Sequence, residues 1–154
     1  MKIIYKIGDL LKASEIVLVH GVNSRGKFAS GVAKVIRGAY PEVYDNYMLT
    51  YKTGKLKLGE IFPVFTENCI IINGVTQEFY GYDDKIYCDY NAIRSCMKKA
   101  NIFCKENGIN AIAMPKIGAG LGGGDFTVIS AIIEEEFTDA QPVVYVLKEN
   151  EIPA

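Results

Sequence analysis

The sequence predicts an α/β fold, a three-layer α/β/α sandwich with a mixed central sheet, because short apolar runs alternate with amphipathic segments along the chain. Two of these runs carry the prediction. Residues 16–20 form a run that is typical of a strand buried on both faces of a parallel sheet. Residues 111–114 form another, which leads through a glycine-rich stretch into a periodic segment. Open α/β sheets bind phosphate at such strand-to-helix crossings.

The N-terminal half contains two predicted strands and two predicted helices. Residues 2–7 form a β-rich run that ends at Gly8, and residues 16–20 form the second strand, which ends at His20. A polar, glycine-bearing loop follows from residue 23 to residue 31, and a helix is expected to begin at residue 32. Pro41 then favours the first turn of a short helix through residue 47.

Four further strands are predicted after residue 59, at residues 60–65, 69–73, 111–114 and 143–147. Apolar residues at three-to-four spacing predict a helix over 90–107, which Asn107-Gly108 ends. A second periodic segment predicts a helix over 127–137. The polar and aromatic stretch 74–84 follows the C-terminal end of a strand, so we expect it to overhang the same site as the glycine-rich stretch.

Length and charge limit the possible functions. A chain of 154 residues predicts one domain, residues 1–154, with a sizeable buried core. The net charge of −1 supplies no basic field, so we expect no non-specific binding of nucleic acid, and an anionic ligand must be held by local geometry. With no Cys-x-x-Cys pair and a single histidine, the sequence predicts no metal site and no cofactor.

Targeting signals are also missing from the sequence. The N-terminus lacks an apolar signal region, and no apolar run approaches membrane-spanning length. We therefore expect no membrane partner and a cytoplasmic location, which would be the host cytoplasm if the source is viral.

The stretch from Pro115 to Phe126 holds five glycines. Glycine reaches positive φ without steric cost and lets backbone N–H groups approach an anion. The stretch lacks the Gly-Lys-Ser/Thr of a Walker loop and the dinucleotide spacing, so by itself it fits either a plain turn or an anion cradle. The loop before residue 32 favours the cradle, because donors at Gly31 and Val32 would lie at the positive end of a helix dipole.

Three polar residues near these loops have two interpretations each. His20 follows a buried strand and could be a packed histidine or an acid or base. Asn23 could serve a turn or face a ligand. Asp125 could be the N-cap of the next helix or a catalytic carboxylate. Their positions alone leave these alternatives open.

Taken together, these segments resemble the macrodomain family, in the branch that includes ADP-ribose-1″-phosphate phosphatases and terminal ADP-ribose glycohydrolases. The matching segments follow one another in the family's order: residues 8–11, residues 20–23 with 31–33, residues 75–77 with 80–81, and residues 115–123. The resemblance implies a macrodomain-like fold and a cleft that binds ADP-ribose as a small-molecule ligand.

The resemblance also implies a role for each matching position. Asp9 would accept a hydrogen bond from the adenine amino group beside the Leu10 backbone, Asn23 would face the distal ribose, and His20 would stand close to it. The remaining implied ligand contacts wrap the diphosphate: Ser30, Gly31 and Val32 from one loop, and Gly118, Ala119, Gly120, Leu121 and Gly122 from the other. Paired amide nests suit a diphosphate in a chain with little positive charge.

The activity that the resemblance favours is removal of the 1″-phosphate from ADP-ribose 1″-phosphate, to give ADP-ribose and phosphate. Such cleavage needs a proton for the leaving alkoxide or a nucleophile. The candidate catalytic residues are His20 and Asp125, and Asp83 or Asp84 could replace Asp125 as the carboxylate partner. No metal ligand set accompanies them.

One departure from the family pattern bears on the reaction. The glycohydrolases of this branch place a nucleophilic lysine where this chain has Gln77, and an aspartate where it has Gly122. Glutamine cannot form a Schiff base with ribose, so the departure favours the phosphatase. An ADP-ribosyl hydrolase acting on modified protein or nucleic acid, and a non-catalytic ADP-ribose-binding module, remain the alternatives.

Overall fold

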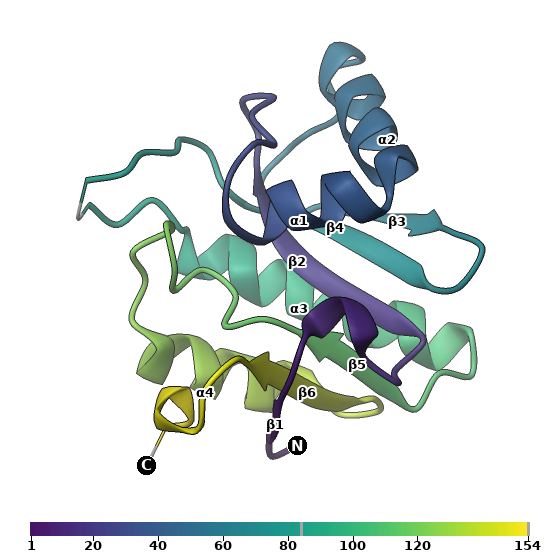
Figure 1. Cartoon of the computed structure of the whole chain (residues 1–154), viewed down its shortest axis with the longest axis vertical. Coiled ribbons are helices and arrows are strands. Elements are labelled where there is room, and N and C mark those ends of the chain that lie inside the picture. Colours follow the sequence, from purple (N-terminus) through teal and green to yellow (C-terminus); the bar gives the residue numbers. More distant parts are fainter. Residues whose placement is uncertain (84, 154) are drawn as a thin grey trace.

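The computed structural model describes residues 1–83 and 85–153 and contains a six-stranded sheet between helices (Figure 1). The strands are β1 Ile4–Ile7, β2 Val17–Asn23, β3 Ile61–Phe65, β4 Ile70–Gln77, β5 Ala111–Met114 and β6 Gln141–Val146. The helices are α1 Gly31–Ala39, α2 Pro41–Lys52, α3 Tyr90–Glu106 and α4 Phe126–Glu136, with short 3-10 turns at Leu10–Lys12 and Glu149–Glu151. The predicted α/β sandwich is confirmed.

The sheet is mixed, as predicted. Its strand order is β1-β6-β5-β2-β4-β3, in which every neighbouring pair is parallel except β3 and β4. Parallel strands end at one edge of the sheet, so the segments that follow β2, β4 and β5 are brought to the same edge.

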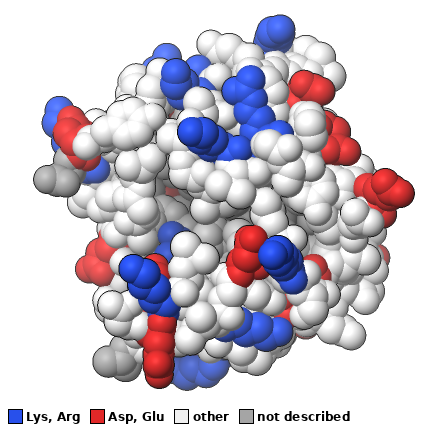
Figure 2. All heavy atoms as spheres, viewed as in Figure 1, with Lys and Arg blue, Asp and Glu red and all other residues white. Residues whose placement is uncertain are grey.

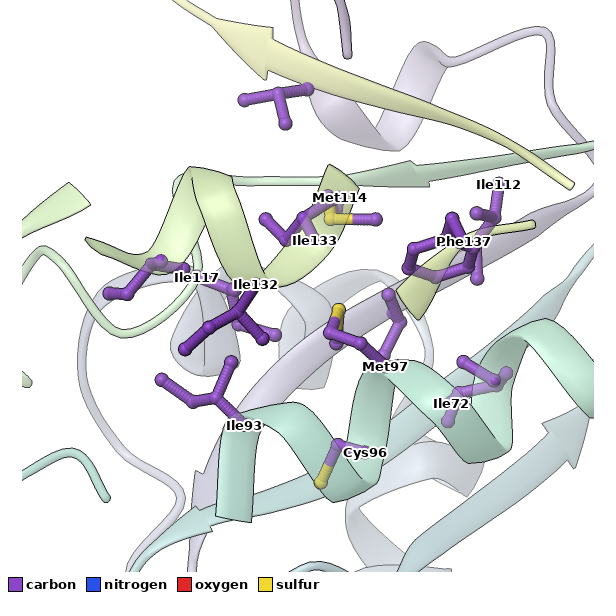
Figure 3. Close-up of a cluster of buried hydrophobic side chains, with 14 of the residues drawn as sticks. Ile72, Ile93, Cys96, Met97, Ile112, Met114, Ile117, Ile132, Ile133 and Phe137 are labelled. Atoms are coloured by element: carbon purple, nitrogen blue, oxygen red, sulfur yellow. The ribbon is translucent and has the colours of Figure 1, made fainter. Parts of the chain in front are cut away.

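The buried strands separate two apolar layers. In β2, Val17 and Val19 belong to the core under α3 and α4, while Leu18 and Val22 belong to the core under α1 and α2. This alternation places apolar side chains on both faces of the strand, which is why residues 16–20 read as an unbroken run. Figure 3 shows the first core, in which Met97 and Ile132 come from the two helices and Ile112 from the sheet.

Two strands run further than the sequence indicated. The predicted strand 69–73 continues as β4 to Gln77, and β2 continues past His20 to Asn23. Their registers pair Val22 with Val75 and Asn23 with Gln77. Polar residues at these ends suggested loops, but each central strand has neighbours that satisfy its backbone groups. Within the described residues, no helix has the length and apolarity to cross a membrane.

Candidate functional site

A pocket of about 320 Å³ opens at the C-terminal ends of β2, β4 and β5. Four segments line it: the end of β2 with the loop into α1, the end of β4, the tip of the loop between β4 and α3, and the loop between β5 and α4. The face drawn in Figure 2 is hollowed near its centre. The two glycine loops of the sequence therefore meet in one pocket, as predicted.

The N-terminus of α1 forms one wall of the pocket. Ser30 is the N-cap residue, but its side chain makes no capping hydrogen bond to the helix. Gly31 has a φ of +60°, and a Cβ at this position would meet no atom within 4 Å. An uncapped helix N-terminus that faces a pocket offers backbone N–H donors and the positive end of the helix dipole to an anion.

The loop between β5 and α4 forms the facing wall. Its own hydrogen bonds use the N–H groups of Ala119, Gly123 and Gly124. Within the part of the chain that the structure describes, the N–H groups of Gly120, Leu121 and Gly122 donate to no protein group. Gly120 has open space around it, so backbone donors here can come close to an anionic ligand.

Other glycines of this loop serve packing. A Cβ on Gly122 would lie 2.6 Å from the carbonyl oxygen of Gly118, and a Cβ on Gly124 would lie 2.5 Å from Cys88 Sγ. The carbonyl oxygen of Gly122 also accepts hydrogen bonds from the N–H groups of Tyr87 and Cys88. The glycine run thus joins the anion loop closely to the segment that follows β4.

Asn23 lines the pocket, but its side chain is committed to the protein. Its Oδ1 accepts from the N–H groups of Arg25 and Lys27 and from the Tyr47 hydroxyl, and its Nδ2 donates to the Lys27 carbonyl at 2.6 Å. The amide therefore shapes the loop from residue 23 to residue 27. The turn interpretation of Asn23 has direct support, and its contact with ribose remains a prediction.

His20 contributes to the floor of the same pocket and is only 1% exposed. Its Nε2 lies 2.6 Å from Asn73 Oδ1, and its ring meets Phe28 edge-on at 5.5 Å between centroids. Because Oδ1 can only accept, the neutral imidazole carries its proton on Nε2. Burial lowers the pKa of His20 to about 4, so the ring is neutral at pH 7. A neutral ring can accept a proton, which fits the base interpretation of His20, and its catalytic role remains a prediction.

The Macro domain family model matches residues 19–133, most of the chain. The chain belongs to the macrodomain family. The macrodomain of Mycobacterium tuberculosis DarG has a TM-score of 0.82 at 28% identity and aligns with 93% of this chain and 96% of its own.

Two further relatives are enzymes by name. The DNA ADP-ribosyl glycohydrolase of Mycobacterium tuberculosis is 30% identical over 151 residues, which cover 93% of this macrodomain and 42% of the relative. The chain thus spans less than half of that protein. The ADP-ribose glycohydrolase OARD1 of Bos taurus is 27% identical over 149 residues, which cover 95% of this macrodomain and 92% of OARD1.

Four of the expected site residues lie outside the pocket lining of this macrodomain: Asp9, Leu10, Ala119 and Asp125. Asp9 is exposed and its Oδ1 accepts from Leu11 N–H, which caps the 3-10 turn after β1. Asp125 is exposed and accepts from Thr127 N–H as the N-cap of α4. Both carboxylates satisfy local backbone donors, as aspartate commonly does at helix starts.

The alternative carboxylates do not line the pocket either, as far as the structure describes them. Asp83 is exposed and accepts from the Tyr87 hydroxyl at 2.5 Å, and Asp84 lies outside the described residues. The expectation that the stretch 74–84 overhangs the site holds for Tyr80, Gly81 and Tyr82, which line the pocket. For His20, the structure thus offers Asn73 as its polar partner in place of a carboxylate.

Sequence reasoning assigned no individual ligand contact to Lys27, Lys116, Tyr80 or Tyr82, all of which line the pocket. Each of these residues is next to a glycine or lies within a segment that matches the family pattern, and this position was the only sequence signal that could have identified them. Lys116 Nζ lies 5.3 Å from the centroid of the Phe126 ring. Two lysines at the rim supply positive charge near the amide donors of both loops.

Proposed function

We propose that this macrodomain binds ADP-ribose between its two glycine loops and hydrolyses ADP-ribose 1″-phosphate to ADP-ribose and phosphate. The binding half of the proposal rests on the uncapped N-terminus of α1, which faces the unused amides of the loop around Gly120 across one pocket. A diphosphate needs several donors at once, and backbone amides supply them without a large positive charge.

The reaction is supported by the residue at the end of β4. Gln77 lines the pocket, and its Nε2 donates to the Phe79 carbonyl at 2.8 Å. An amide in this position cannot add to the ribose as a lysine amine would. Among the described residues that line the pocket there is also no carboxylate. These features favour attack by water on phosphorus over formation of a covalent ribose adduct.

Gly122 adds a steric argument against the lysine and aspartate chemistry. A Cβ on Gly122 would lie 2.6 Å from Gly118 O and 3.1 Å from Gln77 Oε1. An aspartate at this position would therefore push the loop out of its present conformation. The backbone of this macrodomain leaves no room for a Cβ atom at residue 122.

His20 is the side chain that we assign to proton transfer. In the tautomer with the proton on Nε2, Nδ1 keeps a lone pair that can accept a proton from water. The water oxygen forms a bond to phosphorus while the bond from phosphorus to the 1″ oxygen breaks, and the proton that His20 accepted from the water then passes to that oxygen. A pKa of about 4 makes His20 a weak base. Amide donors around the phosphoryl oxygens must therefore supply much of the rate enhancement by stabilising the charge of the transition state.

A second candidate function is the removal of ADP-ribose from a modified protein or nucleic acid. The names of two relatives favour it, because both are ADP-ribosyl or ADP-ribose glycohydrolases. A module that binds ADP-ribose without turnover is the third candidate, and it needs the amide donors alone.

A parallel assay separates the three candidates. The protein is incubated with ADP-ribose 1″-phosphate, with ADP-ribosylated protein and with ADP-ribosylated DNA, and both phosphate and ADP-ribose are quantified. We expect phosphate from the first substrate. Release of ADP-ribose from the second or third would support the glycohydrolase, and binding without any product would support the module. Gly120→Val, which fills the pocket, is the control that should lose every activity.

A further inference from the structure

Ser30 occupies the N-cap of α1 but does not act as a cap. A serine in this position ordinarily accepts a hydrogen bond from the second or third N–H of its helix, here Val32 or Ala33. In this molecule Ser30 Oγ instead accepts from the hydroxyl of Tyr82 at 3.0 Å, and it makes no bond to its own helix. The serine is thus held by a residue more than fifty positions away in the sequence.

Tyr82 is placed by its loop and not by burial, since it is 70% exposed. Hydrogen bonds hold the segment that carries Tyr82 on both sides of this residue. Gln77 Nε2 donates to the Phe79 carbonyl at its start, and the N–H of Tyr87 donates to the Gly122 carbonyl at its end. The Tyr82 hydroxyl then reaches across the pocket from this loop to α1.

We propose that Tyr82 is a positioning residue that keeps the anion site of α1 open by holding the Ser30 hydroxyl away from the N–H groups of its own helix. The proposal rests on the proposed function for the ligand, and on the Tyr82–Ser30 contact for the mechanism. Tyr82 acts through Ser30 and needs no contact with the phosphates.

The physical basis is competition for the same donors. The backbone N–H groups of Val32 and Ala33 can donate either to a bound anion or to the hydroxyl of Ser30. Ser30 is part of the same chain, so it competes whether or not the ligand is present. Without Tyr82, the serine is free to cap the helix, and the ligand must displace it. A typical serine cap corresponds to an equilibrium constant of about five between the capped and the uncapped helix end. Loss of the tyrosine hydroxyl should therefore weaken binding of the ligand by about fivefold.

Calorimetric titration with ADP-ribose tests this inference in Tyr82→Phe, Ser30→Ala and the double variant. We expect about fivefold weaker binding for Tyr82→Phe than for the wild type, and Ser30→Ala, in which the alanine cannot compete for the donors, sets the reference affinity for the double variant. The double variant should bind like Ser30→Ala, since removal of the competitor rescues the loss of the hydroxyl. Tyr44→Phe is the matched control, because Tyr44 lies on α2 outside the pocket lining.

Two results would overturn the proposal. If Tyr82→Phe weakens ADP-ribose binding equally in the wild type and in Ser30→Ala, Tyr82 contacts the ligand directly. If Tyr82→Phe binds with wild-type affinity, its hydroxyl is dispensable. Amide exchange in the ligand-free protein gives an independent reading. Protection of the Val32 and Ala33 amides should rise in Tyr82→Phe and not in the double variant, and unchanged protection refutes the mechanism. If wild-type protein fails to bind ADP-ribose, the proposed function fails, while the exchange result still decides the role of Tyr82.

Discussion

His20 is a titratable side chain in a nearly closed apolar environment. Phe28 covers the ring edge-on, and Asn73 is the polar group that it contacts. Asn73 itself is fully buried, and its Nδ2 has no hydrogen-bond partner among the described residues. A protonated imidazole would therefore have to be buried with a single amide oxygen for compensation. The site favours the neutral ring strongly, which lowers the pKa of His20 to about 4.

This pKa makes stability depend on pH. In the unfolded chain the histidine has a pKa of 6.5, so the unfolded state binds the proton more tightly than the folded state. Full stability is therefore present above pH 6.5 and is lost as the pH falls toward about 4. We expect the free energy of unfolding to drop by about 2 kcal/mol between pH 7 and pH 5 because of this residue. Urea titrations at the two pH values measure the drop.

His20→Gln supplies the comparison, because its amide can still donate to Asn73 Oδ1 but does not titrate. The variant should show a drop smaller by about 2 kcal/mol whatever its absolute stability. The carboxylates whose pKa is lowered, such as Glu15 and Asp139, lose their stabilising charge at lower pH and affect both proteins alike. The same pH dependence in both proteins would contradict the burial argument.

Asp125 is the second residue with two interpretations, and the structure shows its cap geometry. As the N-cap of α4 it accepts from Thr127 N–H at 2.9 Å, and it faces solvent outside the pocket lining. We expect Asp125→Ala to cost about 1 kcal/mol of stability and Asp125→Asn to cost little, since asparagine is an equally good cap. Thermal unfolding measures both. If Asp125→Asn is fully stable but loses phosphate release, the carboxylate is the proton donor after all.

At the scale of elements, the loop between β5 and α4 combines two uses of glycine. Gly120 borders open space in the pocket, whereas Gly122 and Gly124 have backbone or sulfur atoms at less than 3 Å from a Cβ position. A sequence shows the number of glycines in such a loop but not which of them faces a neighbour. That distinction needs the packing of the loop against the segment that follows β4.

A pair of substitutions tests this division. Gly120→Val should keep the thermal midpoint of the wild type and abolish ADP-ribose binding, because its side chain extends into the pocket. Gly122→Ala should lower stability by about 1–3 kcal/mol, the usual cost of overpacking a tight contact. Thermal scans and calorimetry distinguish the two effects. Normal binding in a folded Gly120→Val variant would show that the loop is a turn and not a cradle.

The order of elements was predictable because local patterns determine it. Both helices of the second half and β5 occur within one residue of the predicted bounds, since their periodicity and their glycine or aspartate ends are local signals. The strand ends at Asn23 and Gln77 were missed because they depend on pairing between strands. The two glycine loops were found from sequence. The Tyr82–Ser30 contact was not, because no local signal marks it.

At the scale of the whole molecule, charge is spread and nearly balanced. The net charge is −1, and Figure 2 shows Lys, Arg, Asp and Glu side chains on the same face. Several of the cations are paired with carboxylates, among them Arg94 with Glu135 and Glu136, and Arg25 with Glu78. Such a surface creates no extended positive field around the pocket. Recognition of an anion must then depend on amide donors at short range.

This arrangement predicts how salt affects two ligands. Binding of ADP-ribose should weaken by less than about threefold when NaCl rises from 50 to 500 mM, because fixed backbone dipoles within a pocket are poorly screened. Unmodified DNA should bind with a Kd weaker than about 10⁻⁴ M at physiological salt, since a net charge of −1 supplies no basic field along the surface. Calorimetry and fluorescence anisotropy measure the two. A steep salt dependence of ADP-ribose binding would contradict this prediction and indicate that Lys27 and Lys116 supply the binding energy in place of the loop amides. In that case, Lys27→Met and Lys116→Met should remove the salt dependence.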